Sequence, residues 1–268
     1  MHETAYAKLN LALHVRARRE DGYHELETLF AFVDQGDVLT ATPAAQDTLH
    51  LVGEFAPSLT DPFGNIVAKA LNRLPHGQGW AVLLEKNLPV AAGLGGGSAD
   101  AGAVFRMVEA AHGLPEEWQV RAATLGADVP ACVASEVCIG RGTGTELEPI
   151  INDLAGTPVL LVNPRQPLAT GPVFAGWDGV DRGAIEGQTA REVMLAGRND
   201  LTAPALALCP IIGEVLAALA VTSPIIARMT GSGATCFALY ESPEALAAGS
   251  AIIAAAYPRW WQMQGKLR

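Results

Sequence analysis

The sequence predicts a mixed α/β protein with two lobes. Segments with the two-residue period of strands and segments with the 3.6-residue period of helices both recur along the 268 residues. A loop with four glycines in five residues joins a predicted strand to a predicted helix. Residues 153–158, which include a glycine and a proline, are the best candidate boundary. We therefore expect one lobe over residues 1–155 and a second over residues 156–268.

The composition favours a globular protein that acts on small molecules. Half of the residues are hydrophobic and 17% are charged, which is enough apolar material for a well-packed core. The net charge of -10 argues against nucleic acid or an anionic membrane surface as a partner. No signal peptide or membrane-spanning run is visible, and the four cysteines lack metal or disulfide spacing. We expect a cytoplasmic monomer or homodimer.

The first predicted element is a half-buried strand over Thr4–Val15. Leu9 and Leu11 share one of its faces, and Lys8 and Asn10 lie side by side on the other. Taken alone, this polar face favours a solvated surface over a binding site.

The remaining pattern predicts further strands and helices on both sides of the boundary. A turn at Gly36-Asp37 separates the second and third strands, and Asp61–Gly64 is a predicted loop. The other strands are predicted over Leu26–Val33, Val38–Thr42, Thr48–Val52, Trp80–Glu85, Val137–Ile139, Glu146–Ile150, Val159–Val162, Thr235–Tyr240 and Trp260–Met263. Helices are predicted over Asn65–Leu74, Ala99–His112, 116–125, Thr170–Phe174, Thr189–Ala196, Leu201–Leu208, Ile211–Ala220 and from Ser242 onward.

The glycine loop is the most informative stretch, and it reads Pro89-Val90-Ala91-Ala92-Gly93-Leu94-Gly95-Gly96-Gly97-Ser98-Ala99-Asp100. Glycine lets a backbone approach a ligand closely, and the free N–H groups of the following helix, those of Ser98 and Ala99 among them, would face an anion. The loop has neither the lysine of a P-loop nor the spacing of a dinucleotide fingerprint. A flexible loop without a ligand is the alternative.

Several short motifs together resemble the GHMP kinase superfamily. They are the glycine loop, Ala7-Lys8-Leu9-Asn10-Leu11, Gly126-Ala127-Asp128-Val129-Pro130 and the second glycine turn at Met229–Thr235. The segment Asp21-Gly22-Tyr23-His24-Glu25-Leu26 narrows the resemblance to the 4-diphosphocytidyl-2-C-methyl-D-erythritol kinase family. The resemblance covers nearly the whole chain.

The resemblance implies a two-lobed GHMP kinase fold, with an N-terminal lobe like ribosomal protein S5 domain 2 and a ferredoxin-like C-terminal lobe. It implies ATP-dependent phosphorylation of the 2-hydroxyl of 4-diphosphocytidyl-2-C-methyl-D-erythritol, a step of the non-mevalonate route to isoprenoid precursors. ATP and the alcohol would meet between the lobes.

The resemblance also implies a catalytic pair and a nucleotide site. Asp128 matches the catalytic aspartate, which would orient the alcohol and accept its proton. Lys8 matches the catalytic lysine, which would keep Asp128 ionised and offset charge on the transferring oxygens. The glycine loop would cradle the ATP phosphates, and Asn65 and Lys86 would lie near the adenine. Residues like the last two are as often surface groups as ligands.

The acceptor site is implied in the same way. Tyr23 and His24 match the cytosine-binding pair, although a Tyr-His pair after Asp-Gly is otherwise ordinary turn chemistry. Thr170 and Phe174 match a second wall of that pocket, and Asn10 would fix the substrate beside the catalytic pair.

We expect Mg²⁺ to accompany ATP, held mostly by phosphates and water, with Ser98 as a candidate ligand and no carboxylate assigned. Two alternatives to the proposed activity are open. The first is a GHMP kinase for homoserine, mevalonate or a sugar. The second is a sensor that binds nucleotide without turnover, which the presence of Lys8 and Asp128 disfavours.

Overall fold

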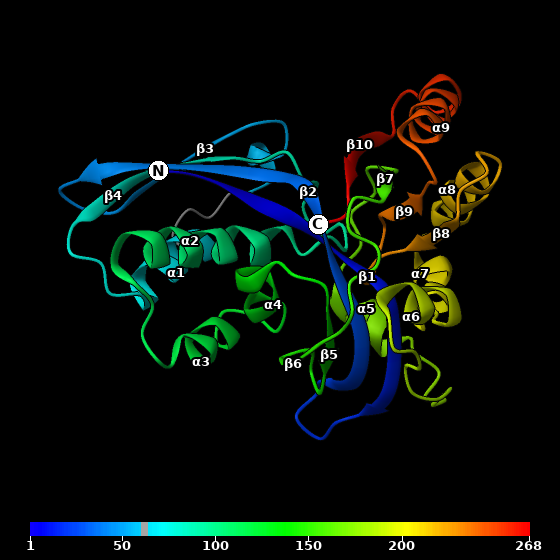
Figure 1. Cartoon of the computed structure of the whole chain (residues 1–268), viewed down its shortest axis with the longest axis horizontal. Helices are drawn as coiled ribbons and strands as arrows, with labels where there is room; N and C mark the ends of the chain where they lie inside the picture. The colour runs from blue at the N-terminus through cyan, green and yellow to red at the C-terminus, as the bar shows by residue number, and fades with distance from the viewer. Residues whose placement is uncertain (60–63) are drawn as a thin grey trace.

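The computed structural model describes residues 1–59 and 64–268, which form two β-sheets with helices on their outer faces (Figure 1). Figure 1 shows α1 to α4 on one face of the first sheet and α8 and α9 beside the second. A mixed α/β fold with two sheets is therefore confirmed. None of the helices described is long and apolar enough to cross a membrane.

The first sheet is built on two long antiparallel strands. β1 (His2–Arg18) pairs with β2 (His24–Ala44) along nearly its whole length. The opposite edge of β2 carries two further ladders, one near each of its ends. Those ladders are β4 (Gly79–Glu85) with β3 (Thr48–Val52), and β5 (Cys138–Arg141) with β6 (Glu146–Pro149).

The predicted turn at Gly36-Asp37 is wrong, because β2 runs straight through these residues. Gly36 lies so close to β1 that a Cβ would come within 1.9 Å of the carbonyl oxygen of Ala5. Asp37 is fully buried, and its carboxylate pairs with Lys86. The two residues therefore serve a close strand contact and a buried ion pair instead of a chain reversal.

The helices of the first lobe cover one face of this sheet and bury Phe30, Phe32, Trp80 and Phe105. They are α1 (Ile66–Arg73), α2 (Gly96–His112), α3 (Trp118–Ala123) and α4 (Val129–Ala134), with a short 3-10 turn at Ala56–Ser58. α4 was not predicted, because Pro130 suggested a break. Proline is tolerated in the first helical turn, which is where it lies here.

The loop predicted over Asp61–Gly64 lies outside the described residues except for Gly64. The other elements of the first lobe are confirmed, with ends that differ by a few residues.

The second sheet is antiparallel, in the order β10-β7-β9-β8. Its strands are β7 (Pro158–Asn163), β8 (Ile226–Met229), β9 (Cys236–Leu239) and β10 (Trp261–Lys266). The helices are α5 (Thr170–Ala175), α6 (Ala190–Ala196), α7 (Thr202–Leu208), α8 (Ile211–Ala220) and α9 (Pro243–Ala256). β8 was missed, since Arg228 and Met229 were assigned to the second glycine turn.

A shared core joins the two sheets and orients β1. Leu9 and Leu11 pack with Leu161, Phe237 and Leu239 of the second sheet. Successive strand residues point to opposite faces, so the even-numbered side chains in this part of β1 face away from that core. The chain leaves the first sheet at β6 and enters the second at β7, and the division after residue 155 stays a prediction.

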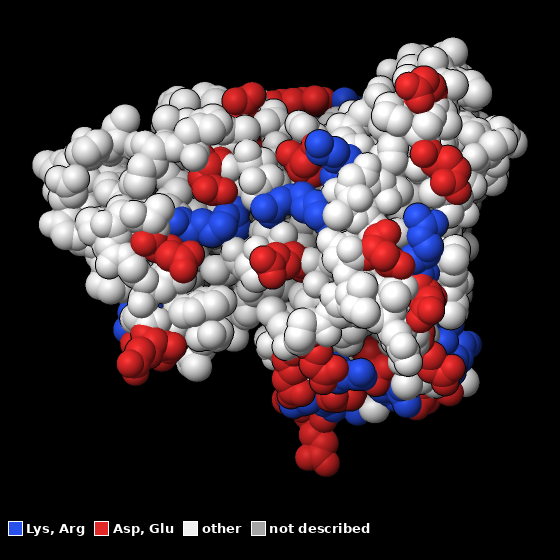
Figure 2. Space-filling view, viewed as in Figure 1, with Lys and Arg blue, Asp and Glu red and all other residues white. Residues whose placement is uncertain are grey.

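The far ends of β1 and β2 form a hairpin that extends to the bottom of Figure 1. Figure 2 shows side chains of both charges gathered there. Arg19 pairs with Asp21 and Glu25, and Arg141 of β5 pairs with Glu27. Such exposed pairs contribute little stability individually, and their main effect is to hold neighbouring segments in register.

Candidate active site

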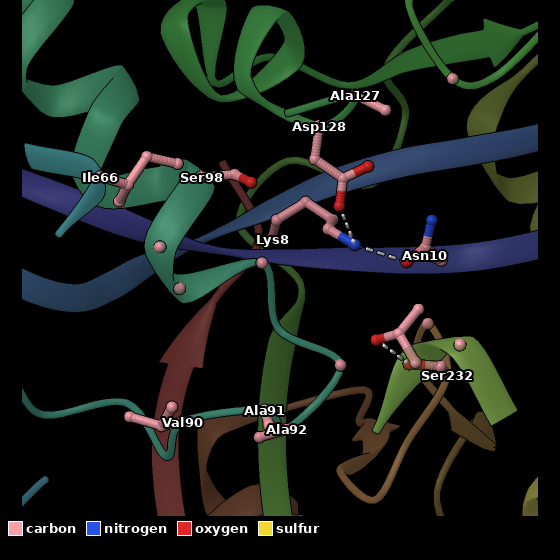
Figure 3. A pocket seen from close by; sticks show the side chains of 18 of the residues that line it. Lys8, Asn10, Ile66, Val90, Ala91, Ala92, Ser98, Ala127, Asp128 and Ser232 are labelled. Carbon is pink, nitrogen blue, oxygen red and sulfur yellow. Dashed lines mark hydrogen bonds and ion pairs between the residues drawn. The ribbon is translucent and has the colours of Figure 1, made fainter. Parts of the chain in front are cut away.

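A cavity of about 960 Å³ opens between the glycine loop, the middle of β1 and helix α5 (Figure 3). All site residues predicted from the sequence line it except Leu94 and Ala99, which are buried. The structure therefore brings together predicted site residues from six separate stretches of the chain.

The centre of the cavity is an ion pair between β1 and the start of α4. Lys8 Nζ lies 3.0 Å from Asp128 Oδ2 and donates to Asn10 Oδ1 at 2.8 Å (Figure 3). The Lys8 side chain is buried, whereas that of Asp128 is 32% exposed. The carboxylate is therefore the member of the pair that a ligand in the cavity can reach.

Asn10 is held by residues that the sequence did not single out. Its Nδ2 donates to Thr28 Oγ1 at 2.7 Å, and the Thr28 hydroxyl donates to the Ala12 carbonyl at 2.7 Å. The backbone N–H of Asn10 donates to Thr230 Oγ1, from the second glycine turn, at 2.9 Å. Thr28 therefore orients the side-chain amide of Asn10 that accepts from Lys8, and Thr230 holds the Asn10 backbone in place.

The glycine loop packs directly against the Lys8–Asp128 pair. Gly95 has a φ of 61°, a left-handed conformation that favours glycine. A Cβ at Gly95 would lie 2.8 Å from Lys8 Cε, so this glycine makes room for the lysine side chain. A Cβ at Gly93 would lie 2.5 Å from the Thr230 carbonyl oxygen, so the two glycine turns touch backbone to backbone.

Helix α2 starts three residues earlier than predicted, and this changes which N–H groups are free. The N–H of Ala99 donates to the Gly95 carbonyl at 2.8 Å and is unavailable to the loop, contrary to our expectation. The first-turn groups without a helical acceptor belong to Gly96, Gly97 and Ser98, which all line the cavity. Their N–H groups and the helix dipole favour an anion there.

Lys86 lies below this helix start in a buried cluster of charges. Its Nζ pairs with Asp37 and lies 2.7 Å from Asp100 Oδ2. Asp37 Oδ1 also accepts from the N–H groups of Asn87 and Leu88 at 2.6 and 2.8 Å. The cluster connects β2, the end of β4 and α2. Asp37 and Asp100, which bind the Lys86 side chain, were not predicted as site residues from the sequence.

The pKa values in this cluster reflect two carboxylates that share one ammonium group. Burial acts to lower the pKa of Lys86, but Asp100 and Asp37 outweigh it and raise that pKa. Burial raises the pKa of Asp100 well above its ordinary value, against the opposing charge of Lys86. Asn65, the other residue predicted near the adenine, caps α1 by accepting from the Val67 N–H at 2.9 Å.

The other end of the cavity is aromatic. The rings of His24 and Phe174 lie 5.1 Å apart, and Tyr23 is 62% exposed at the rim. Thr170 and Ser232 share a hydrogen bond of 3.0 Å across the gap between α5 and the second glycine turn. Ser232 was not predicted individually, although its glycine turn was.

The residues present suit a magnesium ion carried by phosphates better than a protein cage. Among the described residues, no group of three or more His, Cys, Asp or Glu side chains could hold a metal. Mg²⁺ keeps several waters and needs only one or two protein ligands when phosphates are present. The Ser98 hydroxyl and the Asp128 carboxylate are oxygen donors at the cavity that fit this requirement.

Comparison with known proteins covers both lobes. Residues 65–136 match the family described as GHMP kinases N terminal domain, and residues 185–259 match GHMP kinases C terminal. Across all 268 residues the chain is 72% identical to a 4-diphosphocytidyl-2-C-methyl-D-erythritol kinase of Novosphingobium aromaticivorans, of which it covers 93%. It is 61% identical to a protein of the same name from Erythrobacter litoralis, with 99% of each chain covered.

The fold agrees with these relatives. A crystal structure of 4-(cytidine 5'-diphospho)-2C-methyl-D-erythritol kinase superimposes with a TM-score of 0.79 at 32% identity. The match covers 100% of this chain and 99% of that one. Similarity of sequence and fold therefore extends over both lobes and every segment that lines the cavity.

Proposed function

Because the chain belongs to the 4-diphosphocytidyl-2-C-methyl-D-erythritol kinase family of GHMP kinases, we propose that it phosphorylates the 2-hydroxyl of that compound with ATP. The products are the 2-phosphate and ADP, in the methylerythritol phosphate route to isoprenoid precursors. The observation that carries the assignment is the Lys8–Asp128 pair at 3.0 Å, set between a helix N-terminus and an aromatic pocket in one cavity.

Asp128 is proposed as the group that orients the acceptor hydroxyl and accepts its proton. Its side chain lines the cavity and is 32% exposed, while its Oδ2 is held by Lys8. Lys8 keeps the carboxylate ionised and places a positive charge where negative charge develops during phosphoryl transfer. Asn10 uses one amide hydrogen for Thr28 and keeps the second for the acceptor.

The free N–H groups at the start of α2 are proposed to bind the phosphates of ATP. Three such groups and the helix dipole neutralise charge without a P-loop lysine. Mg²⁺ would supply further neutralisation of the transferring phosphate, and Ser98 is the side chain proposed to hold it. Asn65 and Lys86 stay as proposed neighbours of the adenine.

The aromatic end is proposed to hold the cytosine. Tyr23 and Phe174 offer two flat faces for stacking, and base–aromatic stacking contributes about 1–3 kcal/mol per base. His24 supplies the hydrogen bond that separates cytosine from uracil, because a buried group paired to one base is left unpaired by the other. Thr170 closes this wall through Ser232.

A coupled ADP-release assay tests the proposal. Activity is expected with the cytidylated methylerythritol, and kcat/KM for its uridine analogue should be at least about 100-fold lower if one buried pairing is lost. Cytidine monophosphate should compete with the acceptor and not with ATP. Turnover of homoserine, mevalonate or a sugar in place of the cytidylated acceptor would assign another GHMP kinase activity. Nucleotide binding without ADP release would indicate the sensor.

The setting of the enzyme is proposed from its thiols and charge. All four cysteines are free and buried, which suits a reducing cytoplasm. A small molecule is the expected partner, and whether the enzyme is a monomer or a homodimer stays a prediction to be measured by sedimentation.

A further inference from the structure

A pair of residues behind the aromatic end of the cavity, one buried and one exposed, is not used by the chemistry described above. It consists of Trp177, which follows α5, and Arg18, at the end of β1. Trp177 is 3% exposed and packs edge-on to His24, with ring centroids 5.9 Å apart and planes at 81°. His24 borders the cavity, whereas Trp177 packs against His24 and does not line the cavity.

His24 has an unused hydrogen-bonding atom. Its Nε2 is buried and finds no partner among the described residues. Leaving such an atom unpaired is costly, so it is suited to pair with a ligand. Burial lowers the pKa of His24, and the nearby Arg18 guanidinium lowers it further, so the ring is neutral at physiological pH.

Arg18 connects the strand that carries His24 to the segment that carries Trp177. The backbones of Arg18 and His24 are partners in the β1–β2 ladder. The guanidinium group of Arg18 donates to the carbonyls of Trp177 and Ala175 and lies 5.5 Å from the centre of the indole ring. Arg18 therefore holds the indole at a set distance from the imidazole.

The chain beyond Trp177 is tied down along the same hairpin. Arg16 lies 2.9 Å from Asp181, and the N–H of Ile185 donates to Glu27 at 2.6 Å. His14 lies 3.0 Å from the Gly183 carbonyl. The segment 177–185 is therefore held against β1 through His14 and Arg16 and against β2 through Glu27.

We infer that Arg18 and Trp177 are positioning residues for pyrimidine recognition, which fix the plane of the His24 ring so that Nε2 meets the base of the acceptor. The inference rests on the proposed function. Neither residue lines the cavity, whereas His24, against which Trp177 packs, does. They hold the His24 side chain in its binding conformation before the base arrives, so that binding loses less side-chain entropy.

Replacing Trp177 removes the indole, and combining this change with a His24 variant shows whether its effect on acceptor KM depends on His24. Trp177→Leu should raise KM for the acceptor about 5- to 10-fold, the scale of one misaligned hydrogen bond, with kcat and KM for ATP unchanged. The preference for cytidine over uridine should fall by the same factor. In a His24→Ala background, Trp177→Leu should have less than about a twofold further effect on acceptor KM.

Trp261→Leu is the matched control. Trp261 is 6% exposed and packs edge-on to Phe55 at 6.4 Å and 78°, so the lost contact is of the same kind. This variant should lose stability and keep both KM values. If Trp177→Leu does not fold, Arg18→Gln, at the exposed member of the pair, takes its place in the same cycle.

Three results would overturn the inference: unchanged acceptor KM in Trp177→Leu, an effect equally large in the His24→Ala background, or an equal rise in acceptor KM in Trp261→Leu. A failure of the proposed function looks different, because the wild-type enzyme would then not turn over the cytidylated acceptor. In that case calorimetric titration with cytidine monophosphate decides the inference, with the same cycle of variants and the dissociation constant in place of KM.

Discussion

Two lysine–aspartate clusters flank the glycine loop, and they differ in their access to solvent. The Lys8–Asp128 pair borders the cavity, with the Asp128 side chain 32% exposed. In the second cluster, the side chains of Lys86, Asp37 and Asp100 are 4%, 0% and 3% exposed. A reachable carboxylate can accept a proton from a substrate, whereas an enclosed one can only hold its partners in place.

Residue type alone therefore does not distinguish a group that can react with a substrate from one that only stabilises the structure. Lys8 holds one carboxylate that stays partly exposed, while Lys86 is shared by two buried carboxylates, of which Asp37 also accepts from two backbone N–H groups. We therefore expect changes in the first cluster to affect turnover and changes in the second to affect stability.

The largest effect is expected for Asp128→Asn, which keeps the shape of the side chain and removes its basicity. kcat should fall by about 10²–10⁴-fold, the range for loss of general acid–base catalysis. ATP affinity, measured by titration, should change little because the proposed phosphate site is at the start of α2. Near-normal kcat would remove Asp128 from the mechanism.

Lys8→Met is expected to lower kcat through the same step. Since the two groups act as a unit, the double variant with Asp128→Asn should be little worse than the poorer single variant. If the fold-decreases in kcat of the two single variants multiply in the double variant, Lys8 and Asp128 act independently.

Lys86→Met should destabilise the protein by about 3–5 kcal/mol, because it leaves two buried carboxylates without a counter-charge. Urea denaturation measures this loss, and Lys8→Met is the matched control with a smaller expected loss, since water reaches Asp128. A variant that stays stable but shows a raised KM for ATP would instead support a direct contact of Lys86 with the adenine.

Gly95→Ala is expected to disturb the first cluster without touching the second. The new methyl group would press on Lys8 Cε, and the left-handed backbone adds strain. A displacement of Lys8 by about 1 Å can cost about 10²-fold in kcat. Gly97→Ala is the control, because its Cβ meets only Ile66 at 3.5 Å. Equal kcat in the two variants would contradict the proposed packing.

The smallest effect concerns His14, a buried uncharged group on the same strand as Lys8. Burial lowers the pKa of His14 below 6.5, and Arg198 lowers it further. The unfolded chain then binds the proton more readily, so the free energy of unfolding should decrease as the pH falls below about 6.5, by at most about 1.4 kcal/mol per pH unit. Denaturation curves of His14→Gln should lose part of this slope, and those of His50→Gln, at an exposed position of β3, should keep it.

Much of the site could be predicted because its residues lie in short contiguous motifs. Lys8 and Asn10 share a strand face, and Asp128 and His24 belong to segments that are more specific than the glycines alone. A short contiguous motif can be recognised in a single sequence. In the structure these residues all line the same cavity.

The supporting residues could not be predicted, since their roles arise from tertiary burial. Asp37 follows a glycine and reads as a turn, but β2 continues because β1 lies against Gly36. Trp177 begins a glycine- and aspartate-rich stretch that predicts a loop, yet it is buried in the core of the second lobe and its ring packs against His24. In both cases the environment comes from segments far away in the chain.

The hydrogen bond from Asn10 to Thr230 spans 220 positions of sequence, and it has a consequence for biosynthesis. The strand that carries Lys8 leaves the ribosome early, but the residues that brace it against the glycine loop are made only when most of the chain has been translated. Chains emerge at about 5–20 residues per second, so the N-terminal strand waits about ten seconds or more for its partner. Contacts of such long range also form slowly. A nascent or prematurely terminated chain that ends before Thr230 can fold its first sheet and still have no working centre, so activity reports that both lobes have been made and joined.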